Sequence, residues 1–331
     1  MLESLPILDL SQLDAGPEAA ASFREALCRA THEVGFFYLT GTGIPAELEE
    51  RMLSASRAFF ALPEEDKLEI ENTHSPHFRG YTRLGGEHTL GAVDWREQID
   101  ICPEGRALTP EEREGQPPFA RLVGPNQWPT ALPALRPVVD EWTAFLTSVA
   151  SRLLRTWAEA LGEKADFFDT SFGEPFTLLK IIRYPESEGT DQGVGSHKDA
   201  GVLTLLWIED GKAGLQVEHK GSWIDAPPVP GALVVNIGEM LEYATQGYLK
   251  ATTHRVLAPK DGDRVSIPFF FNPALDARLP LVRMPKGLAA PGVSQDPNNP
   301  IHSLYGENCL KSRLRAHPNV TEAHYADLAA S

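Results

Sequence analysis

The sequence predicts a mainly β fold with flanking helices, in which short strands form an antiparallel sandwich or barrel. From residue 175 onward, short segments rich in β-branched and aromatic residues follow one another. Clusters of Gly, Pro, Asp and Lys separate them, which is typical of strands joined by frequent turns. Before residue 175, apolar residues instead recur every three or four positions, which predicts helices. The helices therefore come first and flank the sheets.

Three helices and one strand are predicted in the first half of the chain. Apolar residues share one helical face in residues 17–34, 45–61 and 132–161. Gly162 follows the longest of these segments and is expected to end it. Between the first two helices, GFFYLTG (35–41) predicts a short strand closed by a glycine.

Seven strands are predicted after residue 175. Their sequences are FTLLKIIRY (176–184), VLTLLWI (202–208), GLQVE (214–218), SWIDA (222–226), ALVVNIG (232–238), THRVLA (253–258) and RVSIPFFF (264–271). The polar clusters between them, such as PESEGTDQG (185–193), are expected to be turns.

A single domain spanning residues 1–331 is expected, because the chain offers no long linker near residues 120–135. Within this domain, residues 1–174 are expected to form a mostly helical N-terminal support region. Residues 175–285 then form the β core, and residues 286–331 form a C-terminal helical closing segment.

The composition is that of an acidic globular protein. Lys and Arg number 30 against 46 Asp and Glu, which gives a formal net charge of −16. This acidity argues against nucleic acid or an anionic membrane as the partner. The three cysteines form no C-x-x-C motif, which indicates free thiols in a reducing compartment. With neither a signal-peptide pattern nor an apolar run of about 20 residues, we expect a cytoplasmic protein.

The stretch GSHKDAGVLT (195–204) places His197 and Asp199 two positions apart, directly before an apolar run. Side chains two apart on a strand point to the same side, so both can reach one ion if the segment is extended. Two imidazoles and one carboxylate on one side of a non-haem Fe(II) leave positions open for O2 and a co-substrate. The alternative is a surface polar pair in front of a buried strand.

A third metal ligand would have to lie on another strand of the same sheet. His254 is 55 residues after Asp199 (254 − 199), beyond several predicted strands, and it precedes an apolar strand pattern. This length of chain is enough to cross a sandwich and return. The alternative is a buried histidine that donates a hydrogen bond to a backbone carbonyl.

Arg264 and Ser266 are also two positions apart, at the start of an otherwise apolar strand. A charge is costly there unless it is paired. A guanidinium matches a carboxylate with two parallel hydrogen bonds, and a nearby hydroxyl can add a third. The alternative is a salt bridge to one of the chain's own 46 acidic residues.

These motifs occur in an order that resembles the isopenicillin N synthase-like family of Fe(II)- and 2-oxoglutarate-dependent oxygenases. The resemblance covers nearly the whole chain. It rests on GFFYLTGTGIP (35–45), FFALPEEDK (59–67), RYP (183–185), SHKDAGVLTLL (196–206), GLQV (214–217), GALVVNIGEMLEYATQGYLKATTHRV (231–256) and RVSIPFFFNP (264–273). The sequence departs from the pattern at Thr42, where many members have histidine.

The resemblance implies a double-stranded β-helix, which is a cupin-like jelly roll, with the metal inside one end. It also implies that His197, Asp199 and His254 are the ligands of Fe(II). No catalytic side chain beyond these metal ligands is expected.

For the co-substrate, the resemblance implies that Arg264 and Ser266 hold the distal carboxylate of 2-oxoglutarate, with Tyr184 assisting. The expected reaction uses O2 to oxidise a substrate C–H bond by hydroxylation, desaturation or cyclisation, and releases succinate and CO2. One alternative is an oxidase of the isopenicillin N synthase type, which uses Fe(II) and O2 without 2-oxoglutarate. In that case Arg264 and Ser266 would hold a carboxylate of the substrate. Another is a non-catalytic jelly-roll binding protein.

The substrate is expected to be a small molecule: an amino acid, a modified peptide or a specialised metabolite. The regions that contact substrate in the family contain Arg79, Tyr81, Arg96 and Phe271 here. Arg79 or Arg96 could hold a substrate carboxylate. The alternative is that these arginines pair with the protein's own carboxylates.

Overall fold

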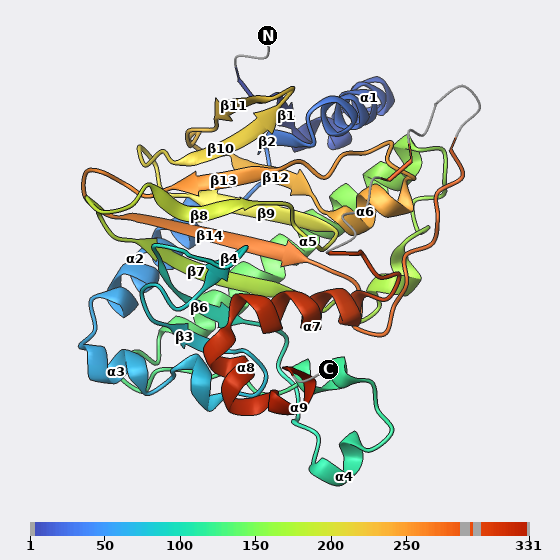
Figure 1. The fold of residues 1–331 in the computed structure, drawn as a ribbon. Helices are drawn as coiled ribbons and strands as arrows, with labels where there is room; N and C mark the ends of the chain where they lie inside the picture. Colours follow the sequence, from blue (N-terminus) through green and yellow to red (C-terminus); the bar gives the residue numbers. More distant parts are fainter. Residues whose placement is uncertain (1–3, 285–291, 294–298, 330–331) are drawn as a thin grey trace.

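The computed structural model describes residues 4–284, 292–293 and 299–329, and two facing sheets dominate it (Figure 1). The strands are β1 (Ile7–Asp9), β2 (Phe36–Thr40), β3 (Gly80–Thr82), β4 (His88–Thr89), β5 (Ala92–Val93), β6 (Glu97–Ile101), β7 (Leu178–Tyr184), β8 (Gln192–His197), β9 (Leu203–Ile208), β10 (Leu215–His219), β11 (Ser222–Asp225), β12 (Leu233–Ile237), β13 (His254–Leu257) and β14 (Arg264–Phe271). The large sheet has the order β1-β2-β12-β9-β14-β7-β6-β3, and the small sheet has the order β11-β10-β13-β8. Strands β4 and β5 form a separate hairpin.

Most helices lie before or after the core strands in the chain, and α6 lies between β12 and β13. They are α1 (Pro17–Glu33), α2 (Ala46–Phe60), α3 (Glu64–Leu68), α4 (Pro110–Arg113), α5 (Leu135–Ala160), α6 (Glu239–Ala244), α7 (Tyr305–Ala316), α8 (Pro318–His324) and α9 (Ala326–Ala329), with short 3-10 helices at Leu10–Asp14, Asn72–His74, Pro118–Leu122 and Asp169–Phe172. Helices α1, α2 and α5 confirm the three helices predicted from periodicity. Helix α5 packs against both α1 and α2, and all three contact the large sheet. Trp142 and Trp157 of α5 are fully buried.

The N-terminal region contributes strands as well as helices. Strand β2, predicted from GFFYLTG, pairs antiparallel with β12, and β6 pairs antiparallel with β7. Residues before and after position 175 therefore share one sheet and one hydrophobic core. The expected boundary between residues 285 and 286 lies outside the described residues.

The seven strands predicted after residue 175 are confirmed as β7 and β9 to β14, but strand β8 was missed. It begins at Gln192, inside the segment expected to be a turn, and its glycines hide it from a pattern of β-branched residues. Gly193 allows close packing, because a Cβ there would lie 3.1 Å from Cδ1 of Tyr184. Strand β8 forms one edge of the small sheet and pairs there with β13.

A buried cluster of charges joins the large sheet to helix α7 and to the segment that precedes the β4–β5 hairpin. Lys180 Nζ lies 2.8 Å from a carboxylate oxygen of Glu87 and 3.6 Å from one of Asp100. Arg313 of α7 also pairs with Asp100, and Nε2 of His317 lies 3.6 Å from the same carboxylate. Each of these side chains is almost fully buried, so the cluster depends on its internal pairing.

The cluster predicts an acid-sensitive contribution to stability. Burial by itself would raise the pKa of Glu87, but the charges of Arg96, Lys180 and His317 outweigh it and lower the pKa from 4.5 to about 2. Because the folded pKa is depressed, the contribution is complete above about pH 4.5 and is lost as the pH falls toward 2. This pKa shift corresponds to a contribution on the order of 3 kcal/mol to the free energy of unfolding. Urea unfolding across this range should show a shallower pH slope for Glu87→Gln than for the wild type.

Glu141→Gln, a change of the same charge at a half-exposed position on α5, is the control for the substitution itself. Equal pH slopes for the wild type and Glu87→Gln would contradict a role of the Glu87 charge in acid stability.

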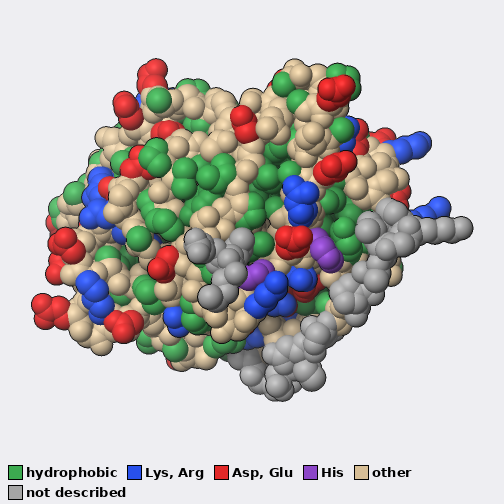
Figure 2. Space-filling view, turned by 90° about the horizontal axis from the view of Figure 1, so that it is seen from above, with side chains coloured by type: hydrophobic (Ala, Val, Ile, Leu, Met, Phe, Trp, Pro, Cys, Tyr) green, Lys and Arg blue, Asp and Glu red, His purple; other side chains and the backbone are tan. Residues whose placement is uncertain are grey.

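No helix in the described part of the chain is long and apolar enough to cross a membrane. On the face shown in Figure 2, Lys and Arg side chains are interspersed with Asp and Glu side chains. The three cysteines are free, as predicted. The cytoplasmic location stays a prediction.

Candidate active site

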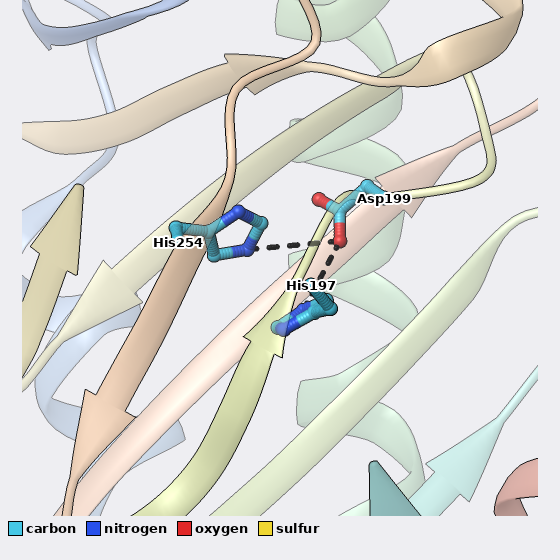
Figure 3. Close-up of side chains that lie close together, drawn as sticks. All are labelled: His197, Asp199 and His254. Carbon is cyan, nitrogen blue, oxygen red and sulfur yellow. Dashed lines mark ion pairs between the residues drawn. The ribbon is translucent and has the colours of Figure 1, made fainter. Parts of the chain in front are cut away.

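The structure brings the three predicted metal ligands together between the sheets (Figure 3). His197 is the last residue of β8, His254 is the first residue of β13, and the two are direct partners in the register of the small sheet. Asp199 lies beyond the end of β8, in the turn that leads to β9. One possible ligand atom from each residue lies within 4.8 Å of the other two. Within the described residues, no other group of three His, Cys, Asp or Glu side chains meets this criterion.

Both histidines are oriented by backbone carbonyls. Nδ1 of His197 lies 2.8 Å from the carbonyl oxygen of Gly195, and Nδ1 of His254 lies 3.1 Å from that of Thr252. Because a carbonyl can only accept, each Nδ1 carries the hydrogen and each Nε2 keeps a free lone pair. The two Nε2 atoms face Oδ1 of Asp199 at 3.6 and 3.8 Å. This is the arrangement of imidazole ligands whose outer nitrogens are fixed by hydrogen bonds.

Two polar side chains hold the other oxygen of Asp199. Thr204 donates from Oγ1 to Oδ2 at 2.6 Å, and Asn236 donates from Nδ2 to the same oxygen at 2.8 Å. Oδ1 is thereby left to face the histidines. Neither residue was predicted from the sequence, although each is a polar residue within an apolar strand pattern, VLTLLWI or ALVVNIG. A polar residue inside an apolar strand pattern was therefore the sequence signal that could have identified them.

The charges of the site suit metal binding at neutral pH. Burial would raise the pKa of Asp199, but His254 and His197 outweigh it and hold the pKa well below its usual value. Burial and the nearby His197 lower the pKa of His254 to about 4. Burial also acts to lower the pKa of His197, but the hydrogen bond and charge of Asp199 raise it overall. A charged carboxylate therefore lies beside a neutral His254, and both forms are those that bind a metal.

The predicted 2-oxoglutarate residues line the same cavity. Arg264 and Ser266 lie on β14, and Tyr184 of β7 is the direct partner of Arg264 in the large sheet. The guanidinium of Arg264 stacks over the Tyr184 ring at 4.3 Å and is only 2% exposed. Its Nη1 donates to the carbonyl oxygen of Ala213 at 3.0 Å, while its Nε has no hydrogen-bond partner among the described residues.

The guanidinium of Arg264 lacks a paired carboxylate in the described part of the chain. Among the described residues, no carboxylate forms an ion pair with it, and burial lowers its pKa. A buried guanidinium without a counter-ion is unfavourable. The residues present therefore fit the groups that the family resemblance implies: a donor set of two imidazoles and a carboxylate for Fe(II), and a buried cation for the distal carboxylate of 2-oxoglutarate.

Of the four predicted substrate residues, the structure brings only Arg96 to the cavity. Arg79 is fully buried elsewhere and donates to the carbonyls of Pro103 and Leu122. Tyr81 donates its hydroxyl hydrogen to Glu97. Both side chains have structural partners that account for them.

Phe271 is also turned away from the cavity. It stacks on Phe172 in the hydrophobic core, while its neighbour Phe270 lines the cavity instead. The alternation of side chains along β14 explains this, because adjacent residues of a strand face opposite sides.

Comparison with known proteins identifies the class of protein to which this fold and this site belong. Residues 5–131 match the family described as non-haem dioxygenase in morphine synthesis N-terminal, and residues 175–273 match the 2OG-Fe(II) oxygenase superfamily. These matches cover more than half of the chain. The chain belongs to the 2OG-Fe(II) oxygenase superfamily, and it is a 2-oxoglutarate-dependent dioxygenase that uses Fe(II).

Individual relatives agree with this assignment. The 2-oxoglutarate-dependent dioxygenase frbJ of Dothideomycetidae sp. (strain 11243) is 38% identical, over 97% of this chain and 91% of its own length. Homoarginine-6-hydroxylase 2-ODD-C23.1 of Arabidopsis thaliana is 34% identical, over 83% of this chain and 86% of its own. These relatives argue against both alternatives, the oxidase that works without 2-oxoglutarate and the non-catalytic binding protein.

A solved structure shows the fold. A full-length Neurospora crassa protein in complex with alpha-KG superimposes with a TM-score of 0.75 at 24% identity, covering 93% of this chain and 95% of that one. The predicted double-stranded β-helix fold is confirmed by this match together with the family assignment.

Proposed function

We propose that this dioxygenase hydroxylates a C–H bond of a small molecule, with Fe(II) on His197, Asp199 and His254. In this proposal Arg264, Ser266 and Tyr184 hold the distal carboxylate of 2-oxoglutarate. The observation that carries it is the buried, carboxylate-free guanidinium of Arg264 in the cavity that also contains the three ligand residues. Hydroxylation of an amino acid is favoured by the relative named homoarginine-6-hydroxylase.

The bound iron and 2-oxoglutarate supply the oxidising chemistry, with succinate and CO2 as products of the co-substrate. The protein's own residues position these groups. The backbone carbonyls of Gly195 and Thr252 keep the Nε2 atoms of His197 and His254 turned inward. The apolar side chains that line the cavity, such as Leu206 and Val256, exclude water around the reacting centre.

Anaerobic titration of the Fe(II)-loaded protein with 2-oxoglutarate is the first test. We expect the weak visible charge-transfer band that 2-oxoglutarate gives when it chelates Fe(II). Binding of iron without this band would contradict the assignment of Arg264 and Ser266 to the co-substrate. Failure to bind iron would contradict the ligand assignment. L-homoarginine is then the first compound to assay for stimulated succinate release.

A further inference from the structure

One charged side chain of the cavity, Arg96, has no role in the proposed function. The other polar residues that line the cavity are the predicted iron ligands, the predicted 2-oxoglutarate residues, and the two residues that hold Asp199: His197, Asp199, His254, Tyr184, Arg264, Ser266, Thr204 and Asn236. Arg96 is 8% exposed and lies on the segment between β5 and β6. An inference about Arg96 rests on the proposed function, because that function assigns the other residues.

The position of Arg96 is fixed relative to the iron ligands. Its Nη2 lies 3.1 Å from a carboxylate oxygen of Glu87 and 3.1 Å from Oδ2 of Asp94. The second oxygen of Asp94 accepts a hydrogen bond at 3.2 Å from the backbone N–H of Gly195, two residues before His197. The main chain adds a further link, since the N–H of Trp95 donates to the carbonyl of Gln192 at 3.1 Å. The guanidinium is thus tied to the strand that carries His197.

Three of the five N–H donors of Arg96 make no hydrogen bond to the described residues. Nη2 is the guanidinium nitrogen closest to both carboxylates. Nε is buried without a hydrogen bond, and Nη1 makes no hydrogen bond in the described part of the chain. A salt bridge that served only stability would be expected to satisfy more of these donors, since an unmet buried donor is costly. The free donors belong to a side chain that lines the cavity.

The charged residues around Arg96 carry no net negative charge that would repel another anion. In the connected cluster, three carboxylates are balanced by three permanent cations: Glu87, Asp94 and Asp100 against Arg96, Lys180 and Arg313. The imidazole of His317 also lies beside Glu87 and Asp100 and adds no negative charge. An incoming carboxylate therefore meets no excess of negative charge. The fork of a guanidinium matches the two oxygens of a carboxylate, whereas a cationic group would find no acceptor on Arg96.

We propose that Arg96 binds a carboxylate of the substrate, so that the enzyme acts on small organic acids such as amino acids. Arg96 is then the residue that determines specificity for an anionic substrate, next to a metal site that does not distinguish substrates. Neutral analogues in which the acid is replaced by an amide leave the guanidinium without its counter-ion and bind weakly.

The test measures carboxylate binding without turnover. Enzyme loaded with Zn(II) and 2-oxoglutarate is titrated with trifluoroacetate and, separately, with trifluoroacetamide, and binding is followed by fluorine NMR. We expect saturable binding of trifluoroacetate to the wild type. Arg96→Gln should weaken this binding roughly 10- to 100-fold, as expected for loss of hydrogen bonds to a charged group. The amide should bind the two proteins equally weakly.

Two further variants keep the test decisive. Arg57→Gln removes an arginine with two acidic partners that does not line the cavity, and should leave trifluoroacetate binding unchanged. Arg96→Lys keeps the positive charge beside Glu87 and Asp94 but loses the two parallel N–H donors of the guanidinium. It replaces Arg96→Gln in the test if that variant does not fold. It should weaken binding about 10-fold.

Several results would overturn the proposal. The first is that trifluoroacetate does not bind to the wild type. The second is that it binds equally to the wild type and to both Arg96 variants, which would indicate an anion on the metal. The third is that the Arg96 variants lose affinity for 2-oxoglutarate as much as for trifluoroacetate, which would assign Arg96 to the co-substrate. A failed proposed function is distinguishable from these outcomes. In that case the wild type consumes no 2-oxoglutarate with Fe(II), while Arg96-dependent binding of trifluoroacetate persists.

Discussion

Replacing Asp199 by alanine is expected to abolish Fe(II)-dependent turnover of 2-oxoglutarate. Loss of a residue that merely orients a metal ligand typically costs about 10- to 100-fold in affinity or activity. Asp199→Ala removes the carboxylate of the three-residue site. Because this is the loss of a ligand itself, affinity or activity should fall by more than roughly 100-fold. Succinate release and Fe(II) binding at equilibrium measure the effect.

The fold should survive the Asp199→Ala change. Asp199 lies in a turn, and its removal leaves Thr204 and Asn236 without an acceptor, at a cost of about 1–3 kcal/mol. Asp140→Ala, on the exposed side of α5, is the matched control and should keep full turnover. Full turnover by a folded Asp199→Ala protein would show that Asp199 is not a ligand.

Residue spacing together with the family resemblance predicted which three residues come together, but not how they are held. His197 and Asp199 were expected to share a strand, whereas Asp199 lies in the turn beyond β8 and is held toward the histidines by its hydrogen bonds to Thr204 and Asn236. Such support comes from other strands and cannot be read from a local pattern. The prediction that His254 lies on another strand of the same sheet was confirmed, because β13 pairs with β8 and places His254 opposite His197.

The substrate side was much less predictable. Arg79 and Arg96 both stand in polar segments of the sequence, and both are buried arginines in the structure. One is engaged by backbone carbonyls and the other faces the cavity with free donors. The difference depends on which loop packs beside each side chain, and this is a property of tertiary contacts rather than of sequence pattern.

Replacing Arg264 by glutamine is expected to raise the KM for 2-oxoglutarate about 30- to 1,000-fold, because a bidentate pair between a guanidinium and a carboxylate in a buried site contributes roughly 2–4 kcal/mol. The distal carboxylate is bound in the ground state and in the transition state alike, so kcat should change much less than KM. Steady-state succinate release at varied 2-oxoglutarate measures both parameters.

The structure also predicts the sign of the stability change. Arg264 is a buried cation with no carboxylate partner in the described residues, so Arg264→Gln should not destabilise the ligand-free protein. Stabilisation by added 2-oxoglutarate should instead disappear, since that stabilisation depends on binding to the folded state. Thermal unfolding with and without 2-oxoglutarate measures both effects.

Gly214 allows the position of the guanidinium to be tested without changing Arg264. A Cβ at Gly214 would lie 2.2 Å from Nη1 of Arg264, so Gly214→Ala should displace the guanidinium and raise the KM for 2-oxoglutarate. Gly211→Ala is the matched control, because Gly211 also has a positive φ but a methyl group added there would have nothing within 4 Å. Because φ is +73° at Gly211 and +147° at Gly214, this variant controls for a side chain at a positive φ rather than for the same strain, and it should leave KM unchanged. An unchanged KM in both Arg264→Gln and Gly214→Ala would mean that the co-substrate's distal carboxylate is held elsewhere.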